Sequence, residues 1–280
     1  MSTWNGGWFG DHGYCALAGN PGIMTLDGTN TWILREQDFG PSVVIDPGPL
    51  DPMHLDAVAQ AAGEVQAVLL THGHLDHSEG ARAFAERVGC GVRALDPAHR
   101  LGDEGLGDGD VVGVGGLEVR VVATPGHTAD SLSFWVPADG AVLTGDTVLG
   151  RGTTVVAHPD GQLGAYLDSL DRLHALAERY GVRAIWPGHG PVIDDALGAL
   201  DFYIAHRRER LAQVEGALLE MTGEADLERS LRHLDLDPGS DAVVTPRTVV
   251  ERVYADVDPV LWGAAELSVR AQLAFLADRP

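Results

Sequence analysis

One short segment constrains this chain more than any other: three histidines and an aspartate stand within six residues, directly after an apolar run. The run, residues 65–71, is nearly continuously apolar, which is typical of a strand buried on both faces. The segment reads Thr71-His72-Gly73-His74-Leu75-Asp76-His77, where we expect the strand to end and a helix to begin. Side chains two apart on extended chain point to the same side, so His72 and His74 can bind one ion. Asp76 and His77, in the following turn, can face a second ion.

Three further polar residues each follow an expected strand. His127 lies in Thr-Pro-Gly-His-Thr, Asp146 in Thr-Gly-Asp-Thr, and His189 in Pro-Gly-His-Gly-Pro. Loops that leave one edge of a sheet commonly build a site together, so we expect these residues to join the first segment. Imidazole and carboxylate are ligands that suit zinc. The sequence therefore predicts two zinc ions per chain, held by His72, His74, Asp76, His77, His127, Asp146 and His189.

Short strands alternate with amphipathic helices over the first two thirds of the chain. Strands are expected at 14–18, 31–34, 43–46, 65–71, 111–114, 117–123, 132–136, 141–144 and 184–186, and helices at 52–62, 81–88, 162–180 and 194–219. Loops are expected between 221 and 245, and two further helices after Pro246 and Asp258-Pro259. The pattern predicts an α/β or α+β fold with strands inside and helices outside. We expect a catalytic domain over 1–212 and a small, mostly helical module over 213–280.

Composition excludes several classes of function. The formal charge is −22 and the chain contains no lysine, which removes Schiff-base chemistry and argues against binding polyanions over the whole surface. No run of eighteen apolar residues is present, so we expect no membrane helix and no membrane partner. The N-terminus lacks the pattern of a signal peptide, and the two cysteines stand far apart without a partner motif. Both features predict a cytoplasmic protein with free thiols.

The ordered motifs between residues 14 and 212 resemble those of the metallo-β-lactamase superfamily. The resemblance implies a four-layer αββα sandwich with metals at one edge, between the two sheets. It also implies that His72, His74 and His127 bind the first metal. Asp76, His77 and His189 would bind the second, and Asp146 would bridge the two. True β-lactamases have a cysteine at the bridging position, so Asp146 argues against antibiotic hydrolysis.

Finer motifs are similar to the β-lactamase-like protein 2 group: Asn20-Pro21-Gly22, Gly28 to Thr31, Leu149 to Thr154, Pro187 to Pro191 and His206-Arg207. That group includes a mitochondrial endoribonuclease of animals and thioesterases of fungal polyketide pathways, and its members carry a winged-helix-like tail. The tail of this chain lacks the basic closing hairpin of a nucleic-acid-binding wing. Within and beside these motifs we predict Asn30, Arg151 and His158 as substrate contacts. Ordinary surface roles for Arg151 and His158 stay open.

These features predict a binuclear zinc hydrolase in which a hydroxide that bridges the metals attacks the substrate. Asp76 and Asp146 are the predicted catalytic residues, which orient the hydroxide and accept its proton. The leading substrate is an ester, thioester or lactone of a small metabolite. An endoribonuclease or phosphodiesterase and a mononuclear-iron sulfur dioxygenase are the alternatives. Residues 207–280 carry nine arginines against fourteen aspartates and glutamates, so we expect no nucleic-acid partner. A homodimer stays open.

Overall fold

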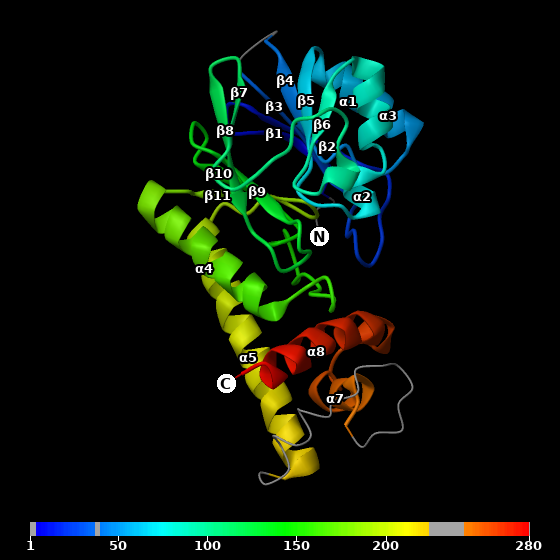
Figure 1. The fold of residues 1–280 in the computed structure, drawn as a ribbon, viewed down its shortest axis with the longest axis vertical. Helices are drawn as coiled ribbons and strands as arrows, with labels where there is room; N and C mark the ends of the chain where they lie inside the picture. Colours follow the sequence, from blue (N-terminus) through cyan, green and yellow to red (C-terminus); the bar gives the residue numbers. More distant parts are fainter. Residues whose placement is uncertain (1–3, 37–39, 224–243, 280) are drawn as a thin grey trace. The chain divides into compact units, whose positions relative to one another are not determined.

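Two β-sheets form the centre of one compact unit of the structure, a computed structural model that describes residues 4–36, 40–223 and 244–279 (Figure 1). The first sheet has the order β1 (Gly7–Phe9), β2 (Gly13–Leu17), β3 (Asn30–Arg35), β4 (Ser42–Ile45), β5 (Val65–Leu69) and β6 (Gly91–Arg93). The second has the order β11 (Ala184–Pro187), β10 (Ala141–Gly145), β9 (Leu132–Val136), β8 (Leu117–Ala123) and β7 (Val111–Val114). Strands β4, β5 and β6 are parallel to one another, and so are β10 and β11.

A continuous apolar core fills the space between the sheets. In β7 and β8 exposed and buried residues alternate, so every second side chain points into this core. The rings of Trp32 in β3 and Trp186 in β11 stack with centroids 4.9 Å apart and planes inclined by 11°. The two sheets are therefore held face to face by interdigitating side chains, as in other β-sandwiches.

Helices cover both outer faces. On the first sheet lie α1 (Pro52–Ala62) and α3 (Ala81–Val88), whose Leu55, Val58 and Phe84 pack with residues of β3 to β6. On the second sheet lies the end of α4 (Leu163–Tyr180): Arg172 donates to the carbonyl of Ala123 in β8 at 3.2 Å. The layers run helix, sheet, sheet, helix, so the predicted αββα sandwich is confirmed. This compact unit comprises residues 1–124, 130–154 and 172–200.

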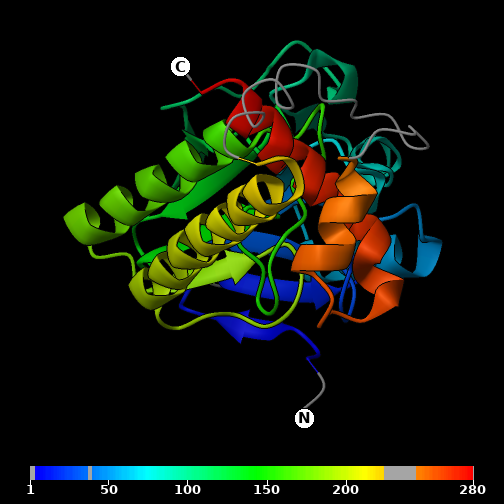
Figure 2. The same cartoon turned by 90° about the horizontal axis from the view of Figure 1, so that it is seen from below.

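A second compact unit comprises residues 125–129, 155–171 and 201–280. It contains most of α5 (Ala196–Thr222), together with α7 (Pro246–Val253), the short helical turn Pro259–Leu261 and α8 (Trp262–Ala277). The side chain of Thr245 accepts from the amide of Thr248 and caps α7, which packs against α8 (Figure 2). The predicted domain boundary after residue 212 falls within α5 and stays a prediction. The loops expected between 221 and 245 lie almost wholly outside the described residues.

The thiols and the apolar C-terminal helix bear on two expectations from composition. Both cysteines are free, as predicted, with Cys15 buried and Cys90 half-buried. The expectation about membrane helices was too strict, because Pro259–Ala277 is long and apolar enough to cross a membrane by length and composition alone. About a third of that window is buried within the fold. The apolar side chains of α8 thus have a packing role, and the absence of a membrane partner stays a prediction.

Candidate metal site

The strands that carry the predicted ligands end at one edge of the sandwich. Asp46 directly follows β4, Thr71 and the histidine segment follow β5, Asp146 follows β10, and His189 follows β11. Since β4 and β5 are parallel, and β10 and β11 are parallel, each pair delivers its carboxyl ends to a common edge. The isolated bridge between Thr29 and His189 ties the two sheets together there.

Four predicted ligands of the first unit face one another closely at this edge. The Nε2 atom of His77 lies 3.2 Å from Nε2 of His189, 3.4 Å from Asp146 Oδ1 and 3.6 Å from Asp76 Oδ2. His189 Nε2 lies 3.1 Å from Asp76 Oδ2 and 3.5 Å from Asp146 Oδ2. One ligand atom from each of Asp76, His77 and His189 therefore falls within 4.8 Å of the others, which is close enough to hold a metal.

The second nitrogen of each of these rings is fixed by a hydrogen-bond acceptor. His77 Nδ1 lies 2.9 Å from Asp46 Oδ2, and His189 Nδ1 lies 3.0 Å from the carbonyl oxygen of Gly28. Both Nδ1 atoms therefore carry a hydrogen, so that each ring in its neutral form directs its Nε2 lone pair at the other ring and at two carboxylates. A convergence of lone pairs and anionic oxygens requires a cation, so these residues fit a divalent metal ion.

His72 and His74 lie beside this group on the same segment. His72 Nε2 lies 3.0 Å from His74 Nδ1, and a ligand atom of His72 falls within 4.8 Å of those of His77 and Asp146. His72 is buried and His74 is exposed, so His74 lies on the accessible side of the site. His127 belongs to the second unit, where its Nδ1 lies 2.7 Å from the carbonyl oxygen of Val155. Its predicted place beside His72 and His74 stays a prediction.

Electrostatics at the site favour positive charge on the imidazoles. Burial would lower the pKa of His77, but the carboxylates of Asp146 and Asp46 outweigh it and raise the pKa well above its usual value. Burial would also lower the pKa of His189, but the carboxylates of Asp146 and Asp76 raise that pKa to about 9. Burial would raise the pKa of Asp146, yet the two imidazoles hold that pKa well below its usual value. The carboxylates are thus anions that attract either protons or metal to the facing nitrogens.

A pH dependence of the metal-free protein follows from these shifts. Folded protein keeps the His189 proton up to about pH 9, whereas the unfolded chain loses it near 6.5. The stabilisation is complete below pH 6.5 and is lost as the pH rises through 9. We expect the Tm of chelator-treated protein to fall over this window, and metal, which competes with the proton, to bind more tightly across it. Calorimetry at several pH values tests this; a Tm that is constant from 6.5 to 9 would contradict it.

Asp46 is a site residue that the sequence analysis missed. Its side chain is 2% exposed and accepts hydrogen bonds from the amide of Thr71 at 2.8 Å and from the Thr71 hydroxyl at 2.6 Å, besides its contact with His77. Its backbone has φ of +51°, a conformation that costs free energy in a residue other than glycine. Asp46 therefore orients His77 and the start of the histidine segment. The signal in the sequence that could have found it is an aspartate directly after the apolar residues of an expected strand.

The loop that carries His189 is held by buried hydrogen bonds. Asn30 donates from its side chain to the carbonyl oxygens of Pro187 at 2.9 Å and Gly190 at 2.8 Å, and accepts from the indole of Trp4. Gly188 has no room for a side chain, because a Cβ there would stand 2.6 Å from Asp146 Oδ1. These contacts give Asn30 a positioning role towards His189. Its predicted contact with substrate stays untested.

The other two predicted substrate contacts lie in different units. Arg151 is exposed in the first unit and forms an ion pair with Asp27. His158 is half-buried in the second unit, where it lines a cavity. Substrate contact stays a prediction for both residues.

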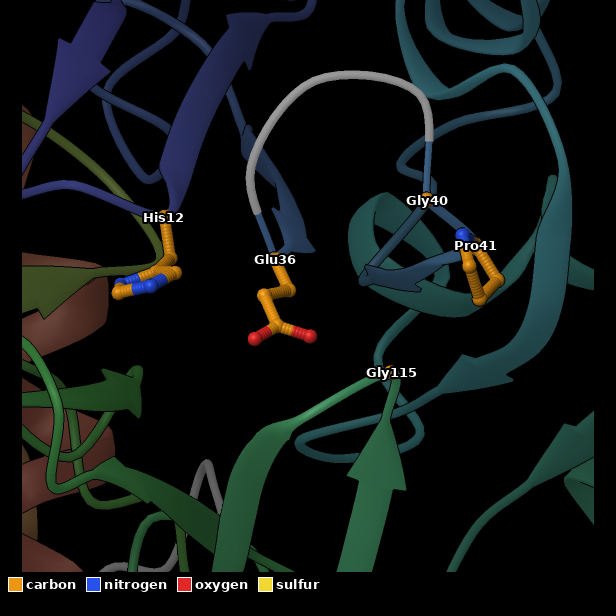
Figure 3. A pocket seen from close by; sticks show the side chains of 5 residues that line it. All are labelled: His12, Glu36, Gly40, Pro41 and Gly115. Atoms are coloured by element: carbon orange, nitrogen blue, oxygen red, sulfur yellow. The ribbon is translucent and has the colours of Figure 1, made fainter.

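A cavity of about 400 Å³ in the first unit lies away from the predicted ligands (Figure 3). It is lined by His12, Glu36, Gly40, Pro41 and Gly115. His12 precedes β2, Glu36 follows β3 and Pro41 precedes β4, so these residues stand at the edge of the first sheet opposite Asp46. This cavity is therefore no part of the candidate metal site.

Comparison with known proteins agrees with this geometry. The profile of the metallo-beta-lactamase superfamily matches residues 24–189, and that of the beta-lactamase associated winged helix domain matches residues 245–279. The second match comprises α7 and α8, so the apolar α8 belongs to a winged helix domain. The predicted winged-helix-like module is therefore confirmed.

In the aligned regions, about a third of the residues are identical between the chain and its curated relatives. The lactamase-like protein nscB of Aspergillus fumigatus is 34% identical over 76% of this chain, which spans only 63% of that relative's length. An atrochrysone carboxyl ACP thioesterase of the same fungus is 37% identical (74% of this chain, 65% of the relative). A beta-lactamase-like protein 2 homolog of Caenorhabditis elegans is 33% identical over 73% of this chain and 70% of that relative's length.

Solved structures show the same fold. The metallo-beta-lactamase family protein TTHA1429 of Thermus thermophilus superposes with a TM-score of 0.71 at 21% identity, covering 95% of this chain and 93% of that one. The protein TTHA1623, solved in a di-iron-bound form, has a TM-score of 0.53 at 26% identity, covering 66% and 96%. Because the superfamily profile covers more than half of the chain and the fold agrees with it, this chain belongs to the metallo-beta-lactamase superfamily.

Proposed function

We propose that this protein is a binuclear zinc hydrolase that cleaves the thioester of a small metabolite. One observation carries the proposal: the Nε2 atoms of His77 and His189 face each other and two carboxylates, while acceptors fix their Nδ1 atoms. This is a donor set for a divalent metal. When bound, such ions lower the pKa of a water molecule and polarise the carbonyl of the substrate.

The two carboxylates have different access to solvent, which suggests different tasks. The side chain of Asp76 is 28% exposed, whereas that of Asp146 is 10% exposed and lies between the buried imidazoles. Asp76 is therefore placed to accept the proton of an attacking water. Asp146 is placed to fix the orientation of the two imidazoles relative to each other. His74 and Leu75, which directly precede Asp76 on the chain, are exposed and lie on the open side of the site.

Thioesters are favoured over the other small-molecule esters by one relative, the atrochrysone carboxyl ACP thioesterase. The resemblance assigns Asp146 to the position where true β-lactamases have cysteine, which argues against a β-lactam substrate. A substrate panel on zinc-loaded protein tests the proposal with an acyl thioester, a lactone, a β-lactam and single-stranded RNA. Thioester cleavage that is at least tenfold faster than cleavage of the others is expected. Preferential cleavage of the lactone or of RNA would overturn it.

Zinc is proposed because imidazole and carboxylate suit it, but the same donors also bind iron. The similarity to a di-iron-bound protein makes iron the main competitor. The group formed by Asp76, His77 and His189 supports a second ion beside the one expected at His72 and His74. Elemental analysis is expected to give two zinc ions per chain. One iron per chain would instead favour the mononuclear dioxygenase alternative.

We expect no appreciable binding to single-stranded RNA at about 150 mM salt, where charges are already screened within ~8 Å. The densest basic cluster, on α5, is engaged within the second unit. Arg207 is buried over the ring of Tyr166, Arg208 pairs with Asp171 at 3.7 Å, and Arg210 donates to the carbonyl of Val253. An anisotropy titration measures the affinity. Sub-micromolar binding that weakens in an Arg208→Gln variant would promote the endoribonuclease alternative.

A further inference from the structure

His54 is a buried imidazole of the first unit that the proposed mechanism does not use. It lies in the first turn of α1, which the side chain of Asp51 caps by accepting from the amide of Met53 at 3.0 Å. His54 is only 7% exposed, and its Nε2 atom lies 2.9 Å from the hydroxyl oxygen of Thr31 in β3. Because an unpaired polar atom costs free energy when it is buried, this contact fixes where the ring stands.

The hydrogen bonds at the Thr31 hydroxyl have a defined direction. The hydroxyl oxygen lies 2.7 Å from the carbonyl oxygen of Asp46, and because a carbonyl only accepts, the hydroxyl donates to it. The hydroxyl must therefore accept from His54, whose Nε2 atom carries a hydrogen. A hydrogen-bond relay thus runs from the His54 ring through the Thr31 hydroxyl to the backbone of Asp46.

The backbone of Asp46 needs such support because its conformation is strained. Its φ of +51° costs free energy in a residue other than glycine, so surrounding contacts have to hold it. Its amide donates to the carbonyl of Leu69 in β5 at 3.0 Å, and its carbonyl accepts from Thr31. These two bonds fix the peptide groups on either side of the Asp46 Cα. They thereby fix the direction in which its carboxylate meets the ring of His77.

His54 also packs against Gly48, two residues further along the same loop. A Cβ at Gly48 would stand 3.3 Å from His54 Nε2, so the ring lies directly against this part of the backbone. The amide of Gly48 donates to the carbonyl oxygen of His77 at 3.2 Å, and Asp46 Oδ2 lies 2.9 Å from Nδ1 of the same residue. The loop 46–48 therefore holds His77 at its backbone and at its ring, and His54 supports the loop at both points.

From these contacts we infer that His54 is a positioning residue for the predicted metal ligand His77, acting through Thr31 and the loop 46–48. His54 itself belongs to none of the clusters that could hold a metal. The inference rests on the metal site of the proposed function but not on the identity of the substrate. Loss of the direct partner of a ligating histidine weakens metal binding by about 10- to 100-fold. Since His54 is one step further out, His54→Leu should weaken it by about 3- to 10-fold.

Competition for zinc between the full chain and a chromogenic chelator tests the relay. His54→Leu and Thr31→Val each remove one member, so the double variant should match the weaker single variant within about twofold. Thr31→Ser keeps the hydroxyl, and the side-chain amide of His54→Gln can donate to Thr31, so both should restore most of the affinity. Wild-type affinity in His54→Leu would overturn the inference. So would multiplied losses in the double variant, or failure of both conservative variants to restore binding.

Val58→Ala controls for a loss of stability alone. Val58 lies on the same helix, is fully buried and packs in the apolar core over the first sheet. This variant should have a lower Tm but the zinc affinity of wild type, because Val58 takes no part in the relay. If Val58→Ala and His54→Leu lose the same affinity, α1 acts on the site only through stability, and the positioning role is refuted.

A measurement on the metal-free protein separates this inference from the proposed function. The hydrogen on His77 Nδ1 is buried and bonded to Asp46, so it should exchange slowly with solvent and give a signal in nitrogen-edited NMR spectra. His54→Leu and Thr31→Val should shift or broaden this signal, whereas Val58→Ala should leave it in place. If the signal responds in this way but wild type binds no zinc, the positioning role holds and the zinc proposal fails. An unchanged signal in both relay variants would refute the positioning role.

Discussion

Replacement of Asp146 by alanine is expected to lower kcat/KM about a thousandfold or more while the fold persists, because the metal supplies several kcal/mol of transition-state stabilisation. The side chain lies 3.4 Å from His77 Nε2 and 3.5 Å from His189 Nε2, at the centre of the candidate site. It takes no part in the two apolar cores. The far-ultraviolet circular dichroism spectrum should therefore be unchanged, and elemental analysis should show reduced metal content. Near wild-type hydrolysis in this variant would rule out the proposed binuclear site.

An alanine at His74 should have an effect of similar size, because His74 is the exposed member of the histidine segment and its ring contacts His72 at 3.0 Å. The matched control is His174→Ala, since His174 lies on α4 and is absent from the clusters that could hold metal. That variant should retain both activity and metal. Equal losses in the two variants would indicate a general effect of removing histidines rather than a role of the segment.

Replacement of Asp46 by asparagine is expected to weaken metal binding by about 10- to 100-fold, the usual effect of losing the partner of a ligating histidine. The amide oxygen of asparagine can still accept from the amide of Thr71. Its NH₂ group would then face the Thr71 hydroxyl and His77 Nδ1, where Asp46 Oδ2 now accepts at 2.6 and 2.9 Å. His77 would have to present a lone pair at Nδ1 and carry its hydrogen on Nε2. The nitrogen that faces His189 could no longer bind metal.

Competition with a chromogenic chelator measures this change in affinity. The chain offers a matched control in Asp139→Asn: Asp139 is also a buried aspartate beside a histidine, 3.0 Å from His12 Nδ1, but at the opposite edge of the sheets. Asp139→Asn should keep full metal affinity even if it lowers the Tm. If Asp46→Asn binds metal as tightly as wild type, the orientation of His77 does not depend on Asp46.

Most of the elements could be predicted from local sequence patterns. The predicted strands at 111–114, 117–123 and 132–136 coincide with β7, β8 and β9, where alternation or β-branched residues mark the strand and glycine or proline marks its ends. Helix α1 starts where Asp51 and Pro52 predict it. The short strands β1 and β6 and the helix α2 were missed. Gly91-Val92-Arg93, for example, has one apolar residue, and its pairing with β5 rather than its own pattern makes it a strand.

The sequence already indicated which residues of the first unit converge at the candidate metal site, because their imidazoles and carboxylates directly follow expected strands. Tertiary structure alone decided how they are oriented. Asp46, Gly28 and Asn30 are distant from His77 and His189 in sequence, yet they fix the two rings and the loop through hydrogen bonds that form only when both sheets are assembled. Likewise the cavity that His158 lines in the second unit exists because α4 and α8, about a hundred residues apart in sequence, pack in the same unit. Local patterns encode elements and chemical groups, whereas orientation and space arise from contacts between distant parts of the chain.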